Sequence, residues 1–290
     1  MPSSTRNHRL DSGPLARSLK AGVPFLVLAV LLLAALPPAL AAQEGQAFDP
    51  GCPLPYAGIA VKHPIDSNCG VEGISTADGP NHLQNRAKNN FCASGEPVTV
   101  TQSDFVNLQA AVAPDKANVA CGSTRHLPAN RSVLHDIYKT SGGATIGEGT
   151  QVRFVAFIDN AHYSDVGPGE AVNCKEHGNE PNDIHIPTVQ SPGDNECSSV
   201  TAEMSPHSRP DAWTDKALNS LGVPVRITGQ LFFDASHCPC TEGHQQPPKR
   251  ISSWEIHPVY GIDVCTAKTL ADCPVGDDTK WHPLTPPPAH

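Results

Sequence analysis

The segment RISSWEIHPVYGIDVC, residues 250–265, predicts a β-strand with two unlike faces. Successive side chains of an extended chain point to opposite sides, so Trp254 and Ile256 share one face while Glu255 and His257 share the other. The apolar face predicts contact with a hydrophobic core. The acid–histidine pair on the opposite face is either the polar outside of that core or part of a working site.

Four further segments alternate between apolar and polar residues in the same way. They are QVRFVAFID at 151–159, NDIHIPTV at 182–189, SSVTAEM at 198–204 and VRITGQLFFD at 225–234. Five short strands, each apolar on one face, are typical of a small closed barrel with a filled interior. Gly229 falls in the middle of the fourth strand, where we expect a bulge or a sharp bend.

A helix is expected between the third and fourth strands, over RPDAWTDKALNSLG at 209–222, with Asp211 as its cap. Three strands, a helix and two strands are the element order of the OB-fold. We therefore expect a mainly β protein with helices, of the α+β class, whose small five-stranded OB-like barrel covers residues 146–266. A split sheet with the helix packed on one face is the alternative.

The chain before residue 140 has a helical pattern. NHLQNRAKNNF at 81–91 places apolar residues four apart, and TVTQSDFVNLQAAV at 99–112 offers Thr101 and Asp104 as a capping box. RSVLHDIYKT at 131–140 is a third short helix candidate. Residues 43–140 therefore predict a mainly helical, disulfide-braced region that precedes the barrel.

The two ends of the chain have biased compositions. Residues 1–42 follow the order of a secretory signal peptide, because a basic segment precedes an apolar run of 14 residues from Val23 to Leu36 and then small residues. That run is short of the ~20 residues that span a bilayer, so we expect cleavage, no membrane span afterwards, and a periplasmic or secreted protein. Retention as an anchor is the alternative. Residues 274–290 are Pro-rich and predict a disordered tail.

All ten cysteines lie after the signal segment, and an even number in an exported chain favours disulfides. The disulfide candidates are Cys52, Cys69, Cys92, Cys121, Cys174, Cys197, Cys238, Cys240, Cys265 and Cys273.

The charge balance narrows the class of partner. The chain has 20 basic and 29 acidic residues, and residues 1–42 hold four bases and one acid, which leaves 16 bases, 28 acids and a net charge of −12. Such a chain repels polyanions, so nucleic acid is an unlikely partner. A glycan, a protein, a small ligand or a metal ion fits better.

The polar faces of the second, third and fifth strands form the first candidate site. In an OB-like barrel these strands are neighbours, and together they present Asp183, His185, Glu203, Glu255 and His257. Such a set is a candidate ligand-binding patch and could provide a general acid and base. Its members His185, His257 and Glu203 could bind Zn²⁺ or Mn²⁺. No other cofactor is expected. The alternative is an ordinary polar surface, since the strand register is not given by the sequence.

Two connections carry the other candidates. HCPCTEGH at 237–244 offers His237, Cys238, Cys240 and His244 as zinc ligands, although disulfides are favoured for its cysteines. Residues 160–182 form a long connection, which is either a functional loop or a disordered acidic one. It carries His162, Asp165, Glu170, Glu176, His177 and Glu180.

Several segments together resemble a set of exported bacterial proteins of uncharacterised function. They are QNRAKNNFCASG, NAHYSDVGPGEAVNC, NDIHI, SSVTAEMSPHSRPDAW, TGQLFFDASH and the WEIHPV-type strand of RISSWEIHPVYGIDVC, and the similarity covers most of the chain after residue 42. The resemblance implies export and an OB-like C-terminal domain, and it implies no activity, so no catalytic residue carries over from it.

Three functions are compatible with these patterns. The first is a non-catalytic binding module for a glycan, a protein or a small molecule, because two long loops flank a polar face and no known catalytic motif is present. The second is a metal-dependent hydrolase that uses the acid–histidine patch. The third is a structural envelope protein.

Overall fold

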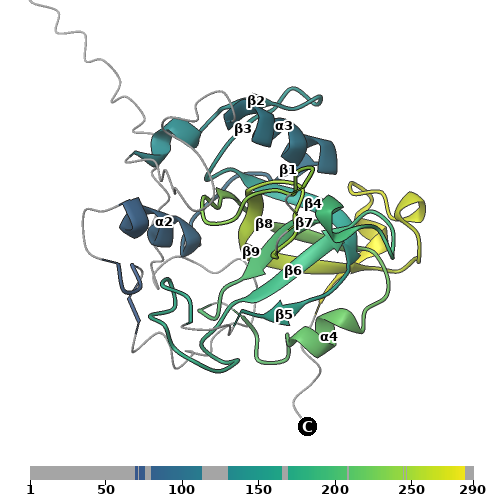
Figure 1. Ribbon diagram of the computed structural model, residues 1–290. Helices are drawn as coiled ribbons and strands as arrows, with labels where there is room; N and C mark the ends of the chain where they lie inside the picture. Colours follow the sequence, from purple (N-terminus) through teal and green to yellow (C-terminus); the bar gives the residue numbers. More distant parts are fainter. Residues whose placement is uncertain are drawn as a thin grey trace, which may run out of the picture. The chain divides into compact units, whose positions relative to one another are not determined.

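Five strands close into a barrel in the computed structural model, which describes residues 69–70, 72–75, 80–112, 130–164, 169–207, 209–243, 245 and 247–284 (Figure 1). The order around the barrel is β4, β8, β9, β7 and β6, and pairing of β4 with β6 closes it. Only β7 and β9 pair in parallel within this ring. The five strands are β4 (Gln151–Ile158), β6 (Ile184–Val189), β7 (Val200–Met204), β8 (Val225–Phe233) and β9 (Trp254–Cys265). The prediction of a mainly β, α+β protein with a five-stranded closed barrel is confirmed.

Shorter elements extend and cover the barrel. β1 (Val98–Val100) pairs with β4, β5 (His162–Tyr163) pairs with β6, and β10 (Trp281–Pro283) pairs with β9. β2 (Tyr138–Lys139) and β3 (Thr145–Ile146) form a separate hairpin. Within the described residues the α-helices are α2 (Pro80–Lys88), α3 (Gln102–Val112) and α4 (Asp215–Asn219). Single 3₁₀ turns occupy Arg131–Leu134, Glu196–Ser198, Leu270–Asp272 and Asp278–Lys280.

The apolar faces of the strands meet inside the barrel, as the alternation predicts. Trp254 and Ile256 of β9 are fully buried in the hydrophobic core, together with Ile227 and Leu231 of β8. The β8–β9 register shifts on both sides of Gly229, which confirms the predicted bulge. A Cβ atom at Gly229 would lie 2.5 Å from the carbonyl oxygen of Pro258, so only glycine allows the two strands to approach this closely.

The predicted helices are partly confirmed. One half of the capping box of α3 forms, because Oδ2 of Asp104 accepts a hydrogen bond from the backbone N–H of Thr101 at 2.7 Å. α4 lies between β7 and β8 as expected, but its cap is Thr214 rather than Asp211, since Oγ1 of Thr214 accepts from the N–H of Ala217. The third helix candidate is only the single turn Arg131–Leu134.

The C-terminal segment differs from its prediction. Residues 274–284, expected to be disordered because of their prolines, instead contain a 3₁₀ turn and β10. The side chain of Trp281 anchors them, since it is 7 % exposed and donates a hydrogen bond to the carbonyl of Pro274 at 3.0 Å. Residues 285–290 lie outside the described residues, as does the whole of the expected signal segment, 1–42.

Disulfides tie distant parts of this unit together. Three bridges join Cys69 to Cys174, Cys197 to Cys240, and Cys265 to Cys273, and Cys92 and Cys238 are also disulfide-bonded. Cys52 and Cys121 lie outside the described residues. Disulfides of this number are typical of an oxidising compartment. Among the described helices, none is both long and apolar enough to cross a membrane.

Candidate functional site

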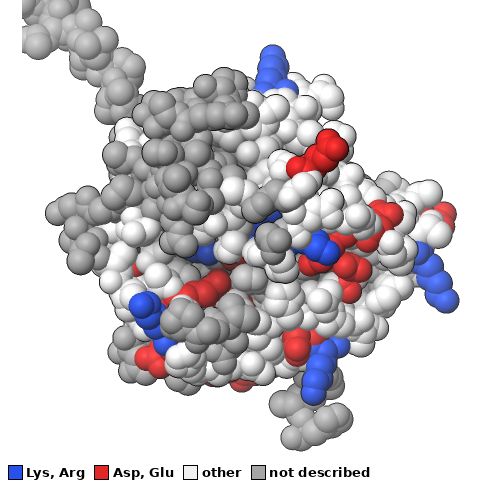
Figure 2. Space-filling model, in the orientation of Figure 1, with Lys and Arg blue, Asp and Glu red and all other residues white. Residues whose placement is uncertain are grey.

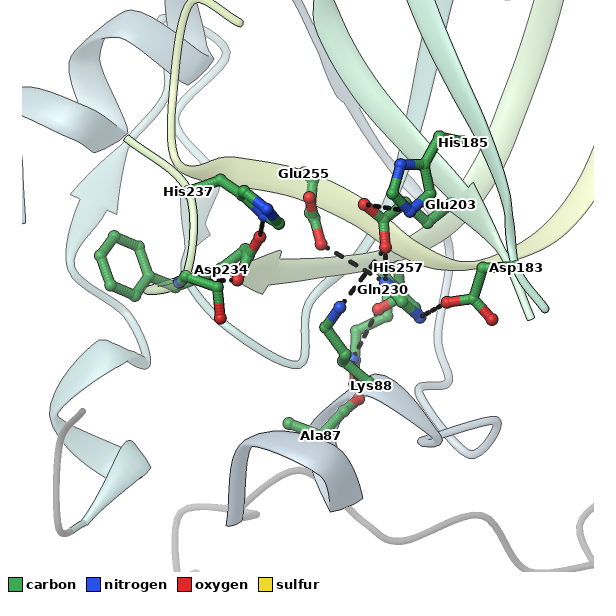
Figure 3. Close-up of polar contacts among 12 residues, drawn as sticks. Ala87, Lys88, Asp183, His185, Glu203, Gln230, Asp234, His237, Glu255 and His257 are labelled. Carbon is green, nitrogen blue, oxygen red and sulfur yellow. Dashed lines mark hydrogen bonds and ion pairs between the residues drawn. The ribbon is translucent and has the colours of Figure 1, made fainter. Parts of the chain in front are cut away.

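The five residues predicted to form a patch converge in the structure (Figure 3). The strand register explains why, because His185 of β6 lies opposite Glu203 of β7, and Ala202 of β7 lies opposite Ile256 of β9. The acidic and imidazole side chains of the three strands therefore share one face. The cluster consists of Asp183, His185, Glu203, Glu255 and His257.

His257 stands at the centre of this cluster. Its Nδ1 lies 2.8 Å from Oε2 of Glu203 and 3.3 Å from Oε1 of Glu255. Its Nε2 lies 3.6 Å from Oδ2 of Asp183. On the other side of Glu203, Nε2 of His185 lies 3.5 Å from Oε1. The two acid–histidine pairs thus form one continuous cluster.

The cluster is buried, although the sequence places it on the outside of a barrel. His185 is 9 % exposed, and the four others are at most 1 % exposed: Asp183, Glu203, Glu255 and His257. The end of α2, the connection at 169–182 and the segment 234–250 all contact the polar face of the barrel. The expectation of a solvent-facing patch is therefore wrong, because alternation within a strand cannot show what packs against its polar side.

Two permanent cations accompany the buried carboxylates. Nζ of Lys88, the last residue of α2, lies 3.5 Å from Oε2 of Glu203. Nη1 of Arg250 donates a hydrogen bond to Oε2 of Glu255 at 2.7 Å and lies 3.6 Å from Oδ2 of Asp234. Both cations lower the cost of burying these acids.

Gln230, next to the bulge in β8, holds the end of α2 against β9. Its Nε2 donates to the carbonyl of Ala87 at 2.8 Å and to the carbonyl of His257 at 2.9 Å, and its Oε1 accepts from Nδ2 of Asn90. The backbone beside Lys88 and the backbone of His257 are thereby joined through one amide. This joint places the ammonium of Lys88 over the cluster (Figure 3).

The electrostatics of the cluster shift several pKa values strongly. Burial disfavours the charged form of His257, but the carboxylate of Glu203 outweighs it and raises the pKa of His257 to about 10. Burial likewise opposes protonation of His185, whose pKa rises to about 9 because Glu203 and Glu170 lie beside it. Burial and the charge of Glu170 raise the pKa of Asp183 to about 6.

A cavity of about 640 Å³ lies beside the cluster. Its ionisable lining residues include His162, Lys88, Glu170, His185, His237 and Arg250. The cavity and the cluster therefore share His185, and the two cations that accompany the cluster, Lys88 and Arg250, also line the cavity. The other four cluster residues do not line the cavity. They lie behind the residues that form its wall, and Glu203 and Glu255 contact those residues.

A histidine–aspartate pair stands in the cavity wall. Nδ1 of His237 lies 2.5 Å from Oδ2 of Asp234, which is fully buried, while the His237 side chain is 33 % exposed. Oδ1 of Asp234 accepts from the backbone N–H of Ser236 at 2.8 Å. Burial alone would raise the pKa of Asp234, but the hydrogen bond with His237 and nearby cations hold that pKa well below its usual range. Asp234 is therefore a fixed anion that orients the imidazole.

The zinc alternative at residues 237–244 is ruled out for its cysteines. Cys240 bonds to Cys197, and Cys238 is also disulfide-bonded, so neither offers a thiolate. His237 pairs with Asp234, and His244 lies outside the described residues.

Two of the candidate residues in the long connection at 160–182, His162 and Glu170, line the cavity. Oε1 of Glu170 lies 3.2 Å from Nε2 of His185, and the His162 ring meets the His185 ring edge-on, with centroids 5.5 Å apart. The remaining acidic and histidine candidates are exposed or undescribed: Glu176, His177 and Glu180 are exposed, and Asp165 lies outside the described residues.

Three cluster residues could hold a metal ion. Asp183, Glu203 and His257 offer ligand atoms that all lie within 4.8 Å of one another. His185, which the sequence grouped with Glu203 and His257, is not part of this set, and it lies between Glu203 and Glu170 and borders the cavity.

Sequence reasoning missed Lys88, Arg250 and the role of the Asp234–His237 pair. The segment FFDASH, in which an acid follows a buried strand and a histidine stands three residues later, carries a usable signal for the pair. Lys88 and Arg250 lie in segments that reach the site only through tertiary packing, so their positions carry no local signal. Comparison with protein-family models, curated proteins and solved structures finds no match.

Proposed function

We propose that the protein is an exported enzyme that binds a small polar molecule in the cavity and hydrolyses it by general acid–base catalysis through His237. The proposal joins two of the functions that the sequence leaves open, ligand binding and hydrolysis. The residues that act on the ligand are those of the cavity wall. The buried cluster supports them from below.

The Asp234–His237 pair carries this proposal. A buried carboxylate that accepts from Nδ1 fixes the tautomer of an imidazole and stabilises its protonated form, so that Nε2 can take a proton from water or a substrate. His237 is exposed enough to meet a ligand, and Asp234 is fully buried, which is the division of roles that such a base requires. Lys88, Glu170 and His185 supply charged groups that could orient a polar ligand in the same cavity.

The amount of buried charge argues against a purely structural role. Four carboxylates of the cluster and of the neighbouring Asp234–His237 pair are at most 1 % exposed: Asp183, Glu203, Asp234 and Glu255. Each buried ion costs several kcal/mol of desolvation, and a hydrophobic substitute often gives equal or better stability. Strongly shifted pKa values concentrated beside a cavity are typical of functional sites.

An OB-like architecture and export of the protein are parts of the same proposal. The position of β7 between β6 and β9, with α4 between the third and fourth barrel strands, supports an OB-like architecture. The disulfides support export. On the face drawn in Figure 2, basic side chains stand apart from one another among acidic ones, which suits a small ligand better than nucleic acid.

The test uses a panel of chromogenic esters, amides, glycosides and phosphate esters with the full exported chain. We expect hydrolysis of at least one class, and we expect His237→Gln and Asp234→Asn to lower its rate by about 10²–10⁴-fold. His282→Gln, at an exposed histidine of β10, is the matched control and should retain full activity. Full activity of His237→Gln would overturn the catalytic role. No hydrolysis of any class would leave a binding module as the function of the cavity.

A further inference from the structure

We propose that Asp183, Glu203 and His257 hold a divalent cation, best suited to Zn²⁺, beneath the cavity and separate from the His237–Asp234 pair. The inference goes beyond the proposed function, because none of these three side chains lines the cavity. It rests on polar atoms that are buried, close together and without hydrogen bonds.

Asp183 presents one free oxygen to this site. Its Oδ1 accepts a hydrogen bond from Nδ2 of Asn173 at 3.0 Å, whereas its Oδ2 makes none with any described residue. The side chain is 1 % exposed, so water in bulk cannot satisfy that oxygen. An unsatisfied carboxylate oxygen at this depth is expensive and requires an explanation.

His257 presents its second ring nitrogen to the same point. Nδ1 faces the carboxylates of Glu203 and Glu255, while Nε2 makes no hydrogen bond among the described residues and faces Oδ2 of Asp183 at 3.6 Å. Ligand atoms about 2.0–2.2 Å from a tetrahedral zinc ion are roughly 3.4 Å from each other. The gap between the oxygen and the nitrogen therefore suits two ligands of one ion.

The contact between Glu255 and His257 matches the usual support of a metal-bound imidazole. Such a histidine commonly donates its other N–H to a carboxylate, which fixes the ring. Oε1 of Glu255 accepts from Nδ1 of His257, and Oε2 of Glu255 accepts from Arg250 at 2.7 Å. Glu255 is thus held in place from both sides, as a supporting group should be.

Glu203 completes the set. Its Oε1 accepts no hydrogen bond from a described residue, and its side chain is 1 % exposed. Its ligand atom lies within 4.8 Å of those of Asp183 and His257. Two carboxylates and one imidazole are good ligands for zinc, and manganese is the second choice.

The charge balance agrees with a divalent cation. Two permanent cations, Lys88 and Arg250, face the four most deeply buried carboxylates, which are Asp183, Glu203, Asp234 and Glu255. A divalent ion would supply the two missing positive charges with both imidazoles neutral. Protonation of His185 and His257 would supply the same charge without a metal, and that is the alternative to be tested.

The experiment titrates the chelator-treated full chain with ZnCl₂, and separately with MnCl₂, by calorimetry, with elemental analysis after desalting. We expect one equivalent of bound metal, and a tetrahedral visible absorption band with Co²⁺. Asp183→Asn should weaken binding by at least about 100-fold, since even the loss of a supporting group costs about 10–100-fold. This variant keeps the size of the side chain, and circular dichroism would check that it folds.

His237→Gln separates this inference from the proposed function. It should leave metal binding unchanged while it removes hydrolysis, and Asp183→Asn tests the metal alone. Absence of one bound equivalent in the folded wild-type chain would overturn the inference in favour of two protonated histidines. Undiminished binding by Asp183→Asn would overturn it as well, because the metal would then lie among the cavity histidines.

Discussion

Two buried glutamates of this protein have the same chemistry and opposite surroundings. Glu148, just before β4, uses both oxygens: Oε2 accepts from Nε of Arg131 at 2.6 Å, and Oε1 accepts from Nη2 of Arg131 and from the N–H of Phe233. Glu203 of β7 is equally buried, yet its Oε1 accepts no hydrogen bond from a described residue. The fold supplies hydrogen-bond donors to both oxygens of Glu148, whereas Glu203 retains an oxygen that can still accept a hydrogen bond or bind a ligand.

The difference separates a structural ion pair from a site. Nη2 of Arg131 also donates to the carbonyl of Phe233 at 2.8 Å, so the Arg131–Glu148 pair joins a 3₁₀ turn to the end of β8. Such a pair stabilises the fold because its desolvation is repaid by directed hydrogen bonds. Around Glu203, charges are close together but incompletely bonded, which is the arrangement expected where a ligand supplies the remaining contacts.

The largest effect is expected from Glu148→Gln. The amide keeps the size of the side chain but leaves the guanidinium of Arg131 buried without its counter-charge, which should lower the free energy of unfolding by about 3–5 kcal/mol. Denaturant unfolding at pH 7 measures it. A loss below about 1 kcal/mol would mean that this pair does not have the structural role assigned to it.

The second-largest loss of stability is expected from removal of the disulfide that holds the connection at 160–182 in place over the cluster. Cys69–Cys174 closes a span of 105 residues and fixes the connection that carries Glu170. Replacement of both cysteines by alanine should cost about 2–5 kcal/mol, because a long loop is released in the unfolded chain. Denaturant unfolding measures this loss as well. Replacement of Cys265 and Cys273, which are 8 residues apart, is the matched control and should cost about half as much by loop length. Equal losses would contradict the loop argument.

Asp183→Asn should raise the free energy of unfolding, whereas Glu148→Gln should lower it. In the metal-free protein the pKa of Asp183 is raised to about 6, from about 3.9 in an unfolded chain, so its ionised form opposes folding. The penalty is absent below pH 4 and complete above pH 6. The variant should therefore match the wild type at pH 4 and exceed its unfolding free energy at pH 7 by up to about 3 kcal/mol. Unfolding curves of chelator-treated protein at both pH values would decide this, and a variant less stable at pH 7 would contradict it.

The smallest effect is expected at the rim of the cavity. Nζ of Lys249 lies 3.7 Å from Oε2 of Glu196, and both side chains are more than a third exposed. Glu196→Gln should change the unfolding free energy by less than about 0.5 kcal/mol, since exposed ion pairs contribute little. It serves as the control for Glu148→Gln, and a comparable loss in both would remove the distinction between buried and exposed acids.

The alternation of residues was enough to predict the five barrel strands, the bulge at Gly229 and the face shared by Glu255 and His257. It also indicated the two acid–histidine pairs, but their convergence depends on register, which is set by the whole ring of strands. The segments that cover the cluster were not predicted, because Lys88 and Arg250 lie in parts of the chain where no periodic pattern indicates this contact. Trp281 shows the same limit, since one buried aromatic outweighs the prolines around it.

The hydrogen bonds made by Gln230 have a consequence for the folding of the protein. Its amide links positions separated by 143 residues at Ala87 and by 27 at His257. Contacts between such distant positions form late, because loop closure must precede them, and strand networks of this kind fold slowly. The cavity wall and the cluster beneath it therefore depend on the same long-range contacts, which exist only when β9 is paired with β8.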